Sequence, residues 1–184
     1  MNDLTFDQVR IQAQVDTAIP NMDPETSMAY CKDGIIDIVK HYDTAGQRQT
    51  ETVQFDGTPV ELSKEVRSIT EVRNEQGYPL SSNVGYQLFP DNTIEFRNTG
   101  FYTVTYLCFP DLDLDYDDPI PLPRMYQEAV HWYLGFKHME RLYGGQDAAS
   151  QYFSQNFNQT CMEADSFYSG QRQYRRIRPS FGRR

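Results

Sequence analysis

The sequence lacks most of the patterns that identify catalytic and membrane proteins. No apolar run approaches the roughly 18 residues that a membrane span needs, and the chain does not open with a basic-then-apolar leader. We therefore expect neither a membrane anchor nor a leader. The Walker loop, the Rossmann glycine pattern, His-Glu-x-x-His and Gly-x-Ser-x-Gly are also missing, so we do not expect an enzyme.

Cysteine is scarce and its spacing is uninformative. Cys31, Cys108 and Cys161 form no CxxC pair and lie within apolar patterns, which predicts buried, reduced thiols in a cytosolic compartment. A Cys–His pair whose members meet only in the fold stays open at this point.

Two patterns resemble metal sites, and both are incomplete. Glu128 and His131 have the Glu-x-x-His spacing of di-iron bundles, but those sites repeat the motif on a second helix. Residues 111–118 alternate Asp with Leu and Tyr. An EF-hand loop starting at Asp111 would need Gly and Glu where Tyr116 and Leu122 stand. We expect no metal and no cofactor, and leave open whether this acidic loop binds a cation or a partner's arginines.

What the sequence does contain is an uneven distribution of charge. The 184 residues carry a net charge of −9, but the last fourteen hold six arginines and no acidic residue. The preceding 170 residues contain 11 Lys and Arg against 26 Asp and Glu, a net charge of −15. An acidic body with a basic tail indicates that the tail has a partner of its own.

Helical periodicity appears in two pairs of segments. Thr5 and Gln8 form a capping box, and Asp23 is placed as a second N-cap before Pro24. The apolar residues of the first segment that share one face are Leu4, Ile11, Val15 and Ala18. Pro123 precedes a third segment, and Gly144-Gly145 separates it from a fourth. The pattern predicts helices at residues 5–19, 24–43, 123–143 and 147–168.

Between these helical pairs the period changes to two. Alternation at 50–55, a β-rich run at 66–73, a hairpin at 86–97 and a strand at 101–108 predict a small antiparallel sheet at about residues 48–108. Ile69 falls out of phase with Val66 and Val72, which indicates a bulge. We predict the α+β class: N-terminal helices and a C-terminal helical hairpin flank a small antiparallel β-sheet insert, in a single domain of residues 1–168.

The first helix of the hairpin is apolar around more than half of its circumference. One hairpin partner cannot cover both directions, so we expect the helix at 24–43 to cover one face. In an oligomer a neighbouring subunit would cover the other. The candidate subunit-interface residues are Met125, Trp132, Phe136 and Met139.

Residues 169–184 lose the periodicity and are expected to form an extended C-terminal arm. The candidate partner-docking residues are Arg172, Tyr174, Arg175, Arg176, Ile177, Arg178, Phe181, Arg183 and Arg184. Docking on an acidic protein surface, binding of nucleic acid, and a disordered solubilising tail are three interpretations of this arm. The acidic body would repel a polyanion, which favours docking on a protein.

Several structural motifs along the chain point to one family. They are residues 92–96 (NTIEF), 100–106 (GFYTVTY), 109–110 (FP), 120–123 (IPLP), 126–130 (YQEAV) and 148–153 (AASQYF). These motifs, in this order of elements, resemble the head–tail connector (adaptor, or head-completion) proteins of tailed bacteriophages. The resemblance extends over roughly residues 53–168 and includes no catalytic motif.

The resemblance implies a structural virion protein of the neck, present in the host cytoplasm during assembly. Such a protein forms a homo-oligomeric, dodecameric ring that binds the portal and the tail or neck proteins. It extends the channel for DNA ejection, through which DNA passes without sequence-specific binding, and it has no membrane partner. The alternative is a nucleic-acid-binding module that uses the C-terminal arginines.

Overall fold

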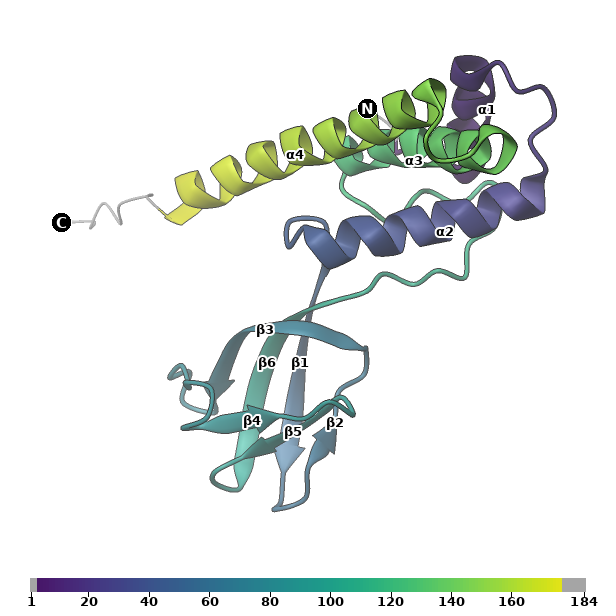
Figure 1. Cartoon of the computed structure of the whole chain (residues 1–184). Helices are drawn as coiled ribbons and strands as arrows, with labels where there is room; N and C mark the ends of the chain where they lie inside the picture. The colour runs from purple at the N-terminus through teal and green to yellow at the C-terminus, as the bar shows by residue number, and fades with distance from the viewer. Residues whose placement is uncertain (1–2, 177–184) are drawn as a thin grey trace. The chain divides into compact units, whose positions relative to one another are not determined.

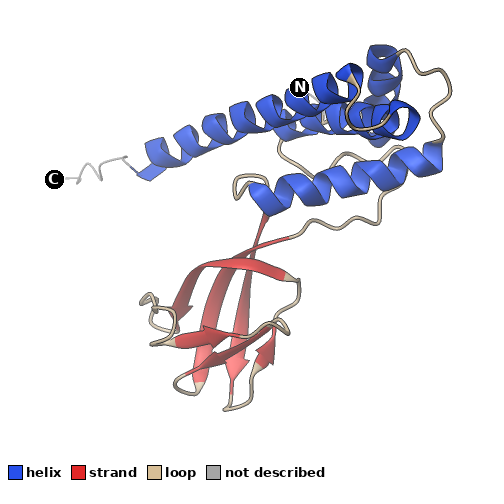
Figure 2. Ribbon diagram, in the orientation of Figure 1, coloured by secondary structure: helices blue, strands red, loops and turns tan. Residues whose placement is uncertain are grey.

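The computed structural model describes residues 3–176, with side chains as far as Gly170. The chain divides into two compact units: a helical unit, built from the segments up to Ala45 and from Asp111 onward, and a β unit, Gly46–Pro110. Helices make up the first unit and strands the second (Figure 2). The predicted α+β class, with a β insert between two helical pairs, is confirmed. The insert, predicted as part of one domain, is a compact unit of its own.

The helical unit contains α1 (Phe6–Thr17), α2 (Pro24–His41), α3 (Arg124–Tyr143) and α4 (Ala148–Arg176) (Figure 1). Both predicted helix starts are confirmed. Thr5 and Gln8 form the capping box of α1, and Asp23 caps α2 by accepting a hydrogen bond from the Thr26 N–H at 2.8 Å. These side chains bind N–H groups that have no partner within the helix, so they determine where each helix begins.

Helix α3 is the centre of the helical unit, because it packs against α1, α2 and α4. Two glycines allow the closest approaches. A Cβ atom at Gly34 of α2 would lie 2.8 Å from the Tyr133 ring, and one at Gly135 of α3 would lie 2.6 Å from the Phe153 ring of α4. We expected that α4 alone could not cover α3. Helices α1 and α2 of the same chain cover further parts of α3.

The orientation of α1 differs from the simplest interpretation of its sequence. The face that packs into the unit carries Phe6, Val9, Ala13 and Thr17. Ile11 and Val15, from the apolar face predicted from the sequence, lie on the opposite side of α1 and are exposed. Helix α1 therefore has apolar residues on two opposite faces, and periodicity alone does not tell which of them is buried.

Helix α4 is longer than predicted. It was expected to end at Tyr168 and give way to an extended arm, but it continues to Arg176. The prediction was wrong because it relied on the loss of apolar periodicity. Residues 169–176 contain no proline and are rich in Gln and Arg, which have high helix propensity, so a helix that has already formed continues through them.

The β unit is formed by two three-stranded antiparallel sheets where one sheet was predicted. Its strands are β1 (Gln47–Phe55), β2 (Val60–Glu61), β3 (Val66–Asn74), β4 (Tyr86–Leu88), β5 (Thr93–Phe96) and β6 (Gly100–Cys108). Their orders are β1-β6-β3 and β2-β5-β4. The predicted bulge in β3 is confirmed by register shifts at Val66/Ser68 and Ile69/Glu71. Tyr102, Val104, Tyr106 and Cys108 of β6 face the core, as their alternation predicts.

Candidate docking surfaces

The four candidate subunit-interface residues lie on α3 in different surroundings. Met139 is buried inside the helical unit, whereas Met125, Trp132 and Phe136 are half-buried. The Trp132 ring packs against Tyr152 and Phe153 of α4, at centroid distances of 6.1 and 5.7 Å. Much of this set is therefore covered within the chain, and its role in an interface between subunits stays a prediction.

Gln127 of α3 organises the link that leads into the helical hairpin. Its side chain is almost fully buried, and its Oε1 accepts a hydrogen bond from the Leu4 N–H at 2.8 Å. Its Nε2 donates to the carbonyls of Ile120 and Leu122, at 3.0 and 2.8 Å. One amide thus joins the start of α1, the proline-rich link and α3. The sequence pattern alone gives no signal that this amide is buried.

A cluster of tyrosines holds α4 to the rest of the helical unit. The Tyr126 ring lies 5.8 Å from Tyr42 and 5.9 Å from Tyr168, measured between centroids. The Tyr126 hydroxyl is hydrogen-bonded to Thr44 and lies 3.3 Å from Oδ1 of Asp165. Burial and the Asp165 carboxylate raise the pKa of Tyr126, so the phenol stays protonated and can donate. The Tyr168 hydroxyl in turn lies 3.3 Å from the Met125 backbone nitrogen, so this cluster fixes α4 close to the point where its described side chains end.

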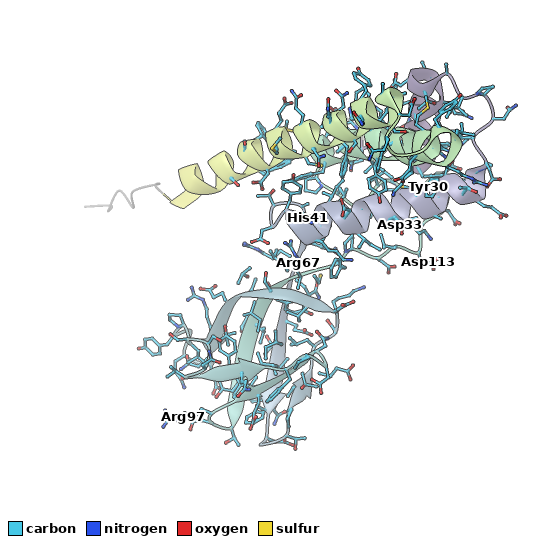
Figure 3. The ribbon with its side chains drawn as sticks, viewed as in Figure 1. Tyr30, Asp33, His41, Arg67, Arg97 and Asp113 are labelled. Carbon is cyan, nitrogen blue, oxygen red and sulfur yellow. The ribbon has the colours of Figure 1, made fainter. Side chains whose placement is uncertain are left out.

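The histidines of α3 have structural partners. His138 Nε2 lies 3.0 Å from Oγ of the buried Ser27, and the Tyr30 ring of α2 meets the imidazole edge-on at 5.2 Å (Figure 3 labels Tyr30). His131 Nε2 lies 3.3 Å from an Asp16 carboxylate oxygen of α1. Burial lowers the pKa of both histidines, and Arg141 lowers that of His138 further. Both imidazoles are therefore neutral near pH 7 and join α3 to its neighbours.

The Ser27–His138 pair does not have the environment of a hydrolase site. Ser27 is fully buried between α2 and α3, where a substrate has no access. The carboxylate nearest in sequence, Asp23, is occupied by the Thr26 N–H that it caps. A serine–histidine pair needs an accessible hydroxyl and a third group that orients the base. This pair connects two helices.

The cysteines are buried thiols. Burial raises the pKa of Cys31 and Cys161 to about 12, so both are protonated near pH 7 and poorly nucleophilic. Cys108 accompanies them as a free, buried cysteine. Within residues 3–170, no group of three or more His, Cys, Asp or Glu side chains is arranged to hold a metal ion. In that same range no helix is long and apolar enough to cross a membrane.

Two of the hollows in the β unit have volumes of about 220 and 300 Å³. The charged residues that line the first hollow are Glu95 and Arg97. The second hollow has one charged residue, Glu65, and is otherwise lined mainly by Val66, Leu88, Phe89 and Pro90. Neither lining set includes a Ser, Cys or His that would serve as a nucleophile or a base.

The acidic link at residues 111–118 is folded against the start of α1. The Asp7 N–H donates to the Tyr116 carbonyl at 3.1 Å, and the Phe6 N–H donates to the Asp118 carbonyl at 3.3 Å. Two of its carboxylates bind backbone N–H groups of the link itself: Asp111 accepts from Asp113, and Asp118 accepts from Asp115. Asp113, labelled in Figure 3, is exposed, as are Asp115 and Asp117. The link is thus an ordered acidic surface beside α1.

The predicted docking arm is described only in part. Arg172, Tyr174, Arg175 and Arg176 belong to α4 by their backbone, but their side chains lie outside the described residues. Ile177, Arg178, Phe181, Arg183 and Arg184 lie outside the described residues altogether. Comparison with models of known protein families and with curated proteins finds no match to the chain.

Proposed function

We propose that the protein is a structural component of a tailed bacteriophage virion: a ring-forming head–tail connector that joins the portal of the capsid to the tail and extends the DNA channel. The ring is a dodecamer, and the protein has no catalytic activity and needs no cofactor. It assembles in the host cytoplasm and resides in the virion neck.

The observation that carries the proposal is the length of α4. Tyr168 is anchored beside the start of α3, and α4 continues for eight residues beyond it, about 12 Å at 1.5 Å per residue. Arg172, Arg175 and Arg176 lie within these eight residues, so the basic segment begins soon after the anchored part of α4 and continues beyond it. A projecting helix with an arginine-rich end is suited to dock on an acidic surface of the portal, because guanidinium groups pair with carboxylates through two parallel hydrogen bonds.

The charge of the remainder of the chain also supports a channel-lining role. DNA that passes through a channel must slide without adhering, and like charge disfavours tight contact between an acidic wall and phosphates. The order of elements, with helical pairs on either side of a β insert, is that of the connector resemblance.

Deletion of residues 171–184 tests the docking role. We expect loss of binding to the portal in a pull-down, with an unchanged far-UV circular dichroism spectrum apart from the loss of the last turns of α4. The matched control keeps the length and replaces the six arginines by lysine, which preserves charge and should retain part of the affinity. Unchanged portal affinity of the deletion variant would contradict the docking role.

The six arginines also support a second candidate, a nucleic-acid-binding module. Titration of short duplex DNA at several salt concentrations separates the two functions. A steep fall of affinity with salt, together with binding at roughly micromolar concentration or tighter, would favour the nucleic-acid module. The connector proposal predicts weak binding to duplex DNA.

A further inference from the structure

The outer face of α1 is an apolar surface without a partner in the helical unit. This face, which we call the α1 outer face, carries Ile11 and Val15, which are 48% and 69% exposed, and the exposed Ala18 follows as the C-cap. Single exposed apolar residues are ordinary, but Ile11 and Val15 lie one turn apart on the same side of the helix. The opposite side of α1 already provides the contact with α3. The α1 outer face is therefore available to another segment.

The acidic link lies beside the N-terminal end of α1, where it binds the backbone N–H groups of Phe6 and Asp7. Tyr116 is 45% exposed, and its ring lies 5.6 Å from that of Phe6. Exposed carboxylates of Asp115 and Asp117 flank it in the link. An exposed aromatic ring and a group of negative charges thus lie at the start of the helix that carries the α1 outer face.

The segment of the chain that best matches this surface is its own C-terminus. Residues 3–45 and 111–170 contain 18 Asp and Glu against six Lys and Arg, whereas residues 171–184 contain six arginines and no acidic residue. Eight residues follow the end of α4, and Ile177, Pro179 and Phe181 alternate in them with Arg178 and Ser180. In an extended chain, alternate side chains fall on the same side, so three apolar residues would face one way and the polar ones the other.

We propose that the α1 outer face, together with the Tyr116 region of the link, is the docking site for the C-terminal segment 177–184 of a second copy of this chain. The apolar side chains of the segment cover Ile11 and Val15, and its arginines pair with the carboxylates of the link. A second copy is the source because α4 continues for eight residues past Tyr168 and its C-terminal end is directed away from α1 of the same chain (Figure 1). The contact between copies uses residues 177–184, which leaves Arg172, Arg175 and Arg176 of α4 for the proposed binding to the portal, so the two contacts are tested separately.

Sedimentation velocity of the full-length protein over a range of concentrations, at low and high salt, tests this proposal. We expect concentration-dependent self-association that weakens as salt rises, because charge pairs contribute to it. The double variant Ile11→Ser/Val15→Ser should weaken self-association by roughly tenfold, since it removes apolar area at the docking site. The matched control, Tyr78→Ser/Val84→Ser, removes exposed apolar side chains of the β unit and should change nothing.

The reciprocal variant, Ile177→Ser/Phe181→Ser, should weaken self-association by a similar factor. When both sets are combined, the loss should be no larger than that of either set alone, because the two sets of residues form one contact. Three results would each overturn the proposal. The protein could be a monomer at every concentration, or the losses of self-association in the two variants could add up when the variants are combined. The third result is weaker self-association in the α1 variant with no change in the C-terminal variant. Portal binding is measured separately. If Ile11→Ser/Val15→Ser weakens self-association and still binds the portal, the contact between copies is supported independently of the connector function.

Discussion

Gln127 illustrates how one buried amide determines the local path of the chain. The proline-rich link is short of backbone donors, because Pro119, Pro121 and Pro123 carry no N–H. The Gln127 side chain donates to the carbonyls of Ile120 and Leu122, and its carbonyl oxygen accepts from Leu4. An amide suits this position because one uncharged group supplies two N–H donors and a carbonyl acceptor.

Replacement of Gln127 by Met should therefore lower the free energy of unfolding by about 2–4 kcal/mol. The substitution keeps the side-chain volume but leaves the Leu4 N–H and the Leu122 carbonyl without their Gln127 partner, and the Ile120 carbonyl with the Leu122 N–H alone. Urea denaturation followed by circular dichroism measures the change. The control is Gln155→Met on the exposed side of α4, which should change stability by no more than about 0.5 kcal/mol. Equal stability of the two variants would contradict the role assigned to Gln127.

The two histidines of α3 give the stability of the helical unit a pH dependence of known sign. Burial lowers the pKa of His131 and His138 in the folded protein, whereas in the unfolded chain both titrate near the usual value of about 6.5. The unfolded state therefore binds protons first as the pH falls. The stabilisation is fully present above pH about 6.5 and is lost as the pH falls below it through the folded pKa values.

We expect the free energy of unfolding to decrease between about pH 7 and pH 5, and the decrease to be smaller in the variant His131→Gln/His138→Gln. His41 is exposed at the end of α2, so His41→Gln serves as the control for the loss of a histidine from the surface (Figure 3). A steeper decrease in the double variant than in the control would show that the sign is wrong.

At the scale of elements, α3 depends on close approach to its neighbours. Gly135 gives Phe153 of α4 the space that a Cβ atom would occupy, and Gly34 does the same for Tyr133. Alanine has a higher helix propensity than glycine by about 1 kcal/mol, so a glycine inside a helix is a cost that close packing must offset.

Gly135→Ala should destabilise the protein by roughly 1–3 kcal/mol, because overpacking exceeds the gain in helix propensity. Gly170→Ala in α4 is the control: a Cβ atom there meets nothing within 4 Å, so the same substitution should be neutral or stabilising. Thermal denaturation compares the two variants. A Gly135→Ala protein as stable as Gly170→Ala would mean that α3 and α4 separate easily to accept the methyl group.

The helices that were located well are those whose ends carry side-chain signals. Thr5, Gln8 and Asp23 bind the first N–H groups of α1 and α2, and such short-range chemistry can be predicted from sequence. The end of α4 has no such signal, and the buried side of α1 depends on where α3 lies. Similarly, β2 has only two residues and pairs with β5, a tertiary contact that alternation does not encode.

At the scale of the whole molecule, the chain consists of two units with separate cores, and its charge is divided between an acidic body and a basic end. Among the described residues the Ser27–His138 pair and the three cysteines are buried, and the candidate interaction sites are surfaces: the α1 outer face, the acidic link and the C-terminal segment. Surfaces of opposite charge on one chain favour assembly, because complementary potentials guide association and fix its register.

The candidate surfaces were only partly predictable. The arginines of the C-terminal segment stand out in the sequence because charge is visible without a fold. Met139 was predicted at a subunit interface but is buried within the helical unit, since α3 has three neighbours in the chain. Ile11 and Val15 became candidates only once the position of α1 was known.

Electron microscopy of the purified full-length chain, mixed with the portal protein encoded in the same genome, tests the connector function most directly. The proposal predicts rings of the chain that cap one end of the portal and continue its channel, and loss of these rings when residues 171–184 are deleted. Portals that stay bare beside a monomeric protein would contradict it.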